Sequence, residues 1–151
     1  MRRVAVIVLV AVLLGSTGRA NNRNAPPPAT RFDAIDVYVD SGTQPLAAYQ
    51  LDLSAKTGDV KIVGIEGGEH SAFADPPYYD PAAMQHDRVI IAAFNTALPE
   101  QLPKGMTRVA TIHVQVAGEA QPTFQAELTV AATLDGKPIP AHLVLQTGAG
   151  Q

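Results

Sequence analysis

Apolar and polar residues alternate over several short segments, and this alternation is the strongest constraint on the fold. In the stretch 47–68, Tyr49, Leu51 and Leu53 are each followed by a polar residue. A period of two places neighbouring side chains on opposite faces of a β-strand, with one face buried and the other solvated. The stretch therefore predicts a strand, a polar turn at 55–59, and a second strand from Val60, the two strands paired as a hairpin.

Similar segments recur along the rest of the chain. We expect further strands at 32–39, 88–94, 107–116 and 123–132, and a return strand that turns Leu143 and Leu145 inward. Segment 88–94 is apolar at both phases, which predicts a central strand covered on both sides. In segment 123–132 the inward phase is expected to comprise Phe124, Ala126, Leu128, Val130 and Ala132.

Turn signals separate these segments and no helical periodicity competes with them. The chain has twelve Pro and twelve Gly in 151 residues. Asp135–Gly136 is a strong tight-turn signal, and the two prolines that follow make the return strand an edge strand. Seven or eight short strands with turns between them predict a single all-β domain, an antiparallel β-sandwich.

The first twenty residues have the pattern of a secretory signal peptide. Arg2 and Arg3 form a positive n-region, residues 4–14 are apolar, and Ala20 closes a small, polar cleavage region. The apolar run is shorter than the ~20 residues of a spanning helix. Membrane association is expected only if this segment stays uncleaved. Behind it we expect a disordered Pro-rich lead-in at 21–31, a sandwich domain at 32–147 and a flexible tail at 148–151.

Charge and cysteine content narrow the partners and the compartment. Three of the eleven basic residues lie in the signal segment, which leaves eight against fourteen acidic residues, a net charge of −6. An acidic surface argues against nucleic acid and against anionic membranes as partners. The chain has no cysteine, which is typical of an exported bacterial protein of the periplasm or the medium that relies on its core.

One long irregular stretch, 66–87, contains the candidate site. It has three prolines, so neither a central strand nor a long helix fits, although Asp80 followed by Pro81 predicts a short helical turn. Loops of this length in compact domains are often functional. The binding residues predicted from it are Glu66, Glu69, His70, Tyr78, Tyr79 and Asp80.

Several chemistries suit these residue types. Tyrosines beside carboxylates stack on sugars or contact a protein partner. Carboxylates and imidazoles also bind Zn²⁺ or Ca²⁺, but their spacing matches no metal motif, so no metal and no cofactor is predicted. No nucleophile motif is present. A small glycoside-active enzyme using Glu66 or Glu69 with a distant acid is the least favoured alternative.

Three blocks resemble the cohesin family. The run AYQLDLSAKTGDVKIVGIEGG resembles the early strands of cohesin modules, RVIIAAFN resembles a later strand, and GMTRVATIHVQV resembles the strand after it. The blocks occur in the family's order and cover roughly residues 32–130. The resemblance implies a jelly-roll β-sandwich related to cellulose-binding modules, with no catalytic activity. It also implies recognition of a dockerin-like protein module by a sheet face, or, as the alternative, polysaccharide binding through the 66–87 loop.

Overall fold

The structure is a computed structural model that describes residues 27–148. The predicted signal peptide, the first part of the lead-in and residues 149–151 lie outside the described residues. The described chain forms eight strands: β1 (Thr30–Asp40), β2 (Ala48–Thr57), β3 (Asp59–Gly67), β4 (Tyr78–Tyr79), β5 (Arg88–Phe94), β6 (Met106–Ala117), β7 (Thr123–Ala132) and β8 (His142–Gly148). Three 3-10 helices connect them: η1 (Ser71–Phe73), η2 (Pro81–Ala83) and η3 (Pro99–Gln101).

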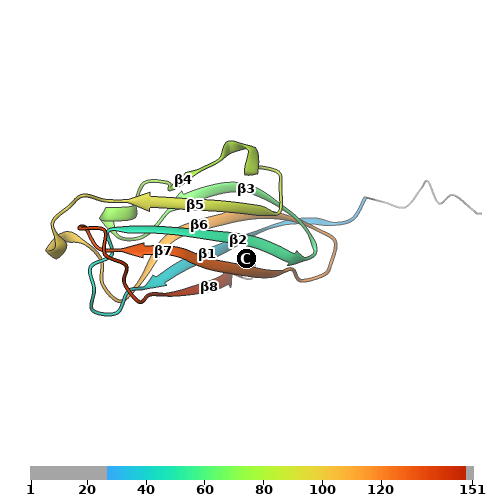
Figure 1. Cartoon of the computed structure of the whole chain (residues 1–151). Coiled ribbons are helices and arrows are strands. Elements are labelled where there is room, and N and C mark those ends of the chain that lie inside the picture. The colour runs from blue at the N-terminus through green and yellow to red at the C-terminus, as the bar shows by residue number, and fades with distance from the viewer. Residues whose placement is uncertain (1–26, 149–151) are drawn as a thin grey trace, which may run out of the picture.

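The strands form two four-stranded antiparallel sheets packed face to face, so the predicted β-sandwich is confirmed (Figure 1). The strand orders are β3-β6-β1-β8 and β4-β5-β2-β7. Strand β1 pairs with β8, β2 with β7, β3 with β6 and β4 with β5. These four pairs nest as in a long hairpin rolled over on itself, which is a jelly-roll-like feature. Two further pairs, β1 with β6 and β2 with β5, complete the sheets.

The core lies between the two sheets and follows the alternation of the sequence. On β1, Ile35, Val37 and Val39 are fully buried, and on β2, Leu51 and Leu53 are as well. Strand β8 is an edge strand, and its Leu143 and Leu145 pack against the core as predicted. The predicted turn at Asp135–Gly136 is also present, with Gly136 at positive φ and its N–H bonded to Thr133 O.

The predicted hairpin at 47–68 is wrong. Strands β2 and β3 belong to different sheets, and residues 55–57 of the expected turn continue β2. Gly58 alone connects the two strands, at φ +91°. The chain reverses direction at Gly58, whose positive φ glycine adopts readily. Strand β3 therefore enters the opposite sheet, where it pairs with β6.

Two predicted strand faces also need correction. Strand β5 is not covered on both sides, because the side chains of Ile90 and Phe94 on its outward face are exposed. On β7, Val130 points outward and Ala131 packs against the core. A register shift between Gln50 and Leu51 inserts one extra residue of β7, and a one-residue insertion reverses the faces beyond it.

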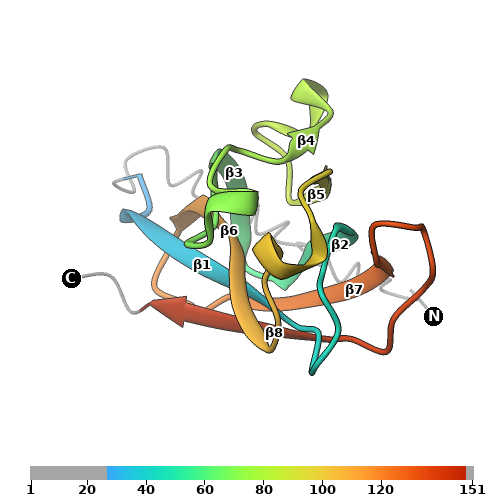
Figure 2. The same ribbon diagram turned by 90° about the vertical axis from the view of Figure 1, so that its left-hand side faces the viewer.

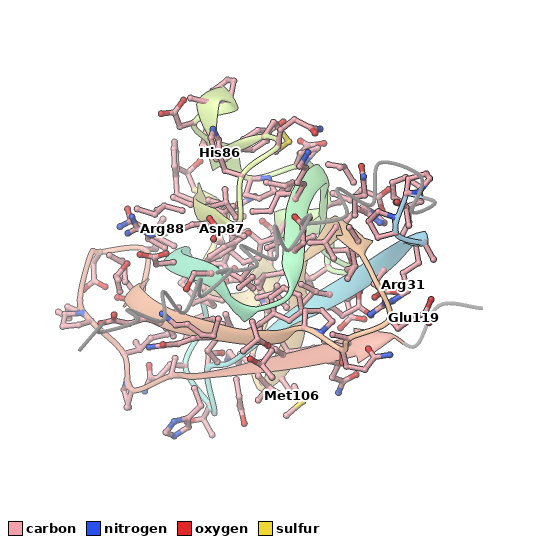
Figure 3. All side chains as sticks on the ribbon, turned by 90° about the vertical axis from the view of Figure 1, so that its right-hand side faces the viewer. Arg31, His86, Asp87, Arg88, Met106 and Glu119 are labelled. Carbon is pink, nitrogen blue, oxygen red and sulfur yellow. The ribbon has the colours of Figure 1, made fainter. Side chains whose placement is uncertain are left out.

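The sandwich begins two residues earlier than predicted. Arg31, assigned to the lead-in, is part of β1 and its guanidinium donates to Gly118 O at 2.8 Å and to Ala120 O at 3.0 Å. Figure 3 shows Arg31 beside Glu119, on the side of the molecule away from Arg88.

Candidate functional site

The outward face of the β4-β5-β2-β7 sheet has no covering layer among the described residues, and it displays apolar side chains. Four of the eight exposed large hydrophobic residues within 27–148 lie on it: Tyr78, Ile90, Phe94 and Val130. Cross-strand pairs place Tyr78 opposite Ala92, Ala92 opposite Gln50, and Gln50 opposite Val130. Directly opposed residues point to the same face, so this row crosses the whole sheet.

An exposed aromatic pair lies at one end of the row. The rings of Tyr78 and Phe94 stack with centroids 6.2 Å apart and planes 12° from parallel. The two residues are 72% and 65% exposed, so each ring leaves most of its surface in water. Nearly parallel rings at this centroid distance are an arrangement that aromatic pairs prefer.

An open groove runs along β5 next to this pair. It has a volume of about 690 Å³, and we call it the β5 groove. One wall is formed by the start of β5, from Arg88 to Ile90, and the other by η2 with Ala82 and Ala83. Figure 2 shows the η2 segment standing away from the sandwich beyond β4.

Two sets of contacts hold the wall formed by η2. At one end Tyr78 and Tyr79 pair with β5. At the other, Gln85 N donates to Ile62 O and Ile62 N donates to His86 O, both at 2.8 Å, which attaches the segment to β3 in the other sheet. Because the segment is anchored to both sheets, the β5 groove is preformed.

An ion pair borders the groove at the start of β5. Arg88 Nε donates to Asp52 Oδ1 at 3.0 Å on the outward face of the sheet. This hydrogen bond, with the positive charge of Arg88, lowers the pKa of the Asp52 carboxyl. Figure 3 shows His86, Asp87 and Arg88 following one another from the protruding segment down to β5.

The structure separates the six predicted site residues. Glu66, Glu69 and His70 lie on the β3 side, and two of them bind the protein's own backbone. Glu69 Oε1 accepts from Arg108 N at 3.1 Å, and His70 Nδ1 accepts from Ala72 N at 3.1 Å as the cap of η1. Glu66 Oε1 lies 3.2 Å from His113 Nε2, without the alignment of a hydrogen bond.

The other three predicted residues lie around the β5 groove. Tyr78 is exposed, whereas Tyr79 points inward and packs against the core. Asp80 caps η2 through a 2.9 Å hydrogen bond from Ala82 N, so the short helical turn expected there is confirmed. The site thus brings Tyr78, Tyr79 and Asp80 together and leaves the Glu66 group elsewhere.

Sequence reasoning missed several residues of this surface: Ile90, Phe94, Val130, Ala82 and Arg88. The sequence of β5 contained an indication of this surface, because three of its four outward-facing residues, Ile90, Ala92 and Phe94, are apolar. That pattern describes an exposed apolar face as well as a covered one.

Among residues 27–148, no group of three or more His, Cys, Asp or Glu side chains is close enough to hold a metal ion. Within the same residues, no helix has the length and apolar character needed to cross a membrane.

No family model matches the chain, and neither a curated protein nor a solved structure is similar to it at a significant level.

Proposed function

We propose that the protein is a non-catalytic, exported binding module that recognises a protein partner through the outward face of the β4-β5-β2-β7 sheet. The observation that supports this proposal is the uncovered apolar row with the stacked Tyr78–Phe94 pair at its end. Aromatic residues are enriched at protein interfaces and supply much of the binding free energy there. The resemblance to cohesin modules suggests a dockerin-like module as the partner.

Polar residues on the same face favour a specific partner. Gln50 Nε2 donates to Thr129 Oγ1 at 3.1 Å, and Arg88 is bonded to Asp52. Side chains held by neighbours lose less conformational freedom on binding. Apolar side chains interspersed with ordered polar groups are typical of a specific protein interface.

Polysaccharide binding is the second candidate, and the same aromatic pair favours it. Exposed tyrosine and phenylalanine rings stack on sugar faces. The chain has no Trp, and the two rings stack on each other instead of forming a row. Protein recognition is therefore the better-supported proposal.

Binding measurements with matched variants distinguish the two candidates. The wild-type protein and Phe94→Ser are tested against a panel of recombinant dockerin modules and against an array of soluble polysaccharides. Binding of a dockerin that weakens at least tenfold in Phe94→Ser supports the first proposal. Tyr79→Phe, which changes an inward-facing ring, is the control and should bind as the wild type does.

Two outcomes contradict the ranking. Polysaccharide binding that is lost in Tyr78→Ala, with no dockerin bound, favours the second candidate. Dockerin binding that is equally strong in the wild type and in Phe94→Ser excludes this face as the interface.

A further inference from the structure

We propose that β5 is a docking strand, to which an extended basic peptide adds as a further strand inside the β5 groove. This is a second binding mode at the sheet edge and does not depend on recognition by the sheet face. Extended peptides commonly bind by adding a strand to an exposed edge, where ladder hydrogen bonds supply affinity and side-chain pockets supply specificity.

The backbone N–H and C=O groups of β5 point alternately toward β2 and away from it. Ala55 N donates to Asp87 O and Asn95 N donates to Ala47 O, both at 2.8 Å. In an antiparallel ladder, alternate residues exchange both bonds with the same neighbour. Odd-numbered residues of β5 therefore bond to β2, and Arg88, Ile90, Ala92 and Phe94 direct their backbone groups away from it.

Strand β4 uses little of that free edge. It pairs with β5 only at Ala92 and Ile91. The carbonyl of Asp80 is next in line to accept from the Ile90 N–H, but it accepts from Ala83 N at 2.9 Å instead. Within residues 27–148, the N–H of Ile90 and both backbone groups of Arg88 thus have no strand partner. Arg88 and Ile90 are among the residues that line the β5 groove.

The walls of the groove indicate which peptide fits. Ala82, Ala83 and Ala92 leave room for a branched apolar side chain at its centre. The lining carboxylates are Asp87 and Asp80, whose Oδ1 also accepts from Ala82 N, while the lining cation Arg88 is bonded to Asp52. His86 is the remaining titratable side chain of the imidazole or carboxyl type in the lining. Charge complementarity therefore selects an extended peptide with a small apolar residue flanked by lysine or arginine.

Amide hydrogen exchange tests the open edge directly. In the free protein, the amides of Arg88 and Ile90 should exchange at least tenfold faster than those of Val89 and Ile91, which bond to β2. Equal protection of all four amides would refute the proposal.

Peptide selection tests the docking itself. A phage-displayed library of random linear heptapeptides is selected on the full-length protein, and enriched peptides are synthesised. We expect sequences with alternating apolar residues and at least one lysine or arginine, and we expect a bound peptide to slow exchange of the Ile90 amide at least tenfold. Failure to enrich any peptide, or enrichment of acidic ones, would overturn the inference.

Matched variants separate backbone pairing from side-chain contact. Ile90→Pro removes the outward N–H without removing a bond to β2, and it should weaken peptide binding at least tenfold, whereas Ile90→Ala should weaken it less than threefold. Ala82→Trp fills the groove from the opposite wall and should also abolish binding. Ala120→Trp, at an exposed alanine outside the groove, is its control.

Two further outcomes would overturn the proposal. Equal binding to the wild type, Ile90→Pro and Ala82→Trp would place the peptide elsewhere. A dimer in sedimentation velocity that Ile90→Pro dissociates would show that the occupant is a second copy of this chain.

Loss of face binding in Phe94→Ser with peptide binding unchanged would show that the two modes are independent.

Discussion

The two halves of the 66–87 segment use their residues in opposite ways. The first half contains Glu66, Glu69 and His70, yet Glu69 and His70 bind backbone N–H groups and Phe73 is buried. The second half contains the small residues Ala82 and Ala83, and it forms the open β5 groove. Carboxylate and imidazole side chains in a loop are thus poor indicators of a binding site, because the loop's own backbone N–H groups also need hydrogen-bond acceptors.

The largest expected effect is the difference in unfolding free energy lost when an aromatic residue is removed from each half. Phe73 is 3% exposed and packs edge-on against Tyr49 at 5.2 Å, so Phe73→Ala should lower the free energy of unfolding by about 3–5 kcal/mol. Tyr78→Ala, in the exposed half, should change it by less than about 0.5 kcal/mol. Urea unfolding measures both. Similar losses for the two variants would mean that the halves do not differ in packing.

The next effect is the pH dependence of the unfolding free energy caused by Tyr49, whose ring packs against Phe73 of the first half. Burial raises the pKa of the Tyr49 hydroxyl, which donates to Val109 O at 3.1 Å. The unfolded chain ionises at the ordinary pKa near 10.0, while the folded protein stays protonated. The stabilising contribution of the protonated Tyr49 hydroxyl is therefore complete below pH 10. Above pH 10 the free energy of unfolding should fall by about 1.4 kcal/mol per pH unit.

Tyr49→Phe isolates that contribution. This variant lacks the hydroxyl and should show a shallower decline in unfolding free energy between pH 10 and pH 11, measured by urea unfolding at each pH. Identical slopes for the wild type and Tyr49→Phe would show that Tyr49 does not cause the decline.

A smaller effect is expected at the cap of η1. His70→Ala leaves Ala72 N without its acceptor and should cost about 0.5–2 kcal/mol of unfolding free energy. His70→Asn keeps an acceptor at a favoured cap position and should retain most of it. Thermal unfolding of both variants is the measurement. If His70→Ala is as stable as the wild type, His70 is available for another role.

The smallest effect belongs to the Arg88–Asp52 pair beside the second half. Arg88 is exposed and Asp52 is partly exposed at the surface. Surface ion pairs contribute little to stability, so Asp52→Asn should lower the melting temperature by a few degrees at most. Since Arg88 lowers the pKa of Asp52, this contribution is complete above the ordinary value of 3.8 and is lost as pH falls through the lowered value. A difference between wild type and Asp52→Asn that grows at low pH would contradict this assignment.

Much of the fold could be predicted from local patterns. Burial of Ile35, Val37, Val39 and Leu51 follows from alternation alone, and so does the sandwich class. Strand pairing did not follow, because alternation gives the face of a strand and not its neighbour. Gly58 alone connects two strands that belong to different sheets. Its polar, Gly-containing surroundings have the same sequence pattern as a hairpin turn, so the sequence could not distinguish the two connections.

The site was predicted only in part, for a related reason. Tyr78 and Asp80 were identified from the loop that contains them. The outward position of Val130 depends on a register shift against Gln50, and the open edge at Ile90 depends on where the Asp80 carbonyl turns. The register shift is decided by contacts between distant strands, which no local pattern records. The turn at Asp80 is local and was predicted, but the pairing that places it beside Ile90 joins β4 to β5 and could not be read from the turn alone.

The pairing of β1 with β8 has a mechanical consequence. Ala34, near the start of β1, lies opposite Gly148, the last residue of β8, so both ends of the described chain leave the sandwich on the same side (Figure 2). A pulling force applied through these ends would open the β1–β8 ladder one hydrogen bond at a time, because the force acts along the bonds and not across them. Tethered at both ends, this domain would yield under tension by peeling β8 from the edge of its sheet.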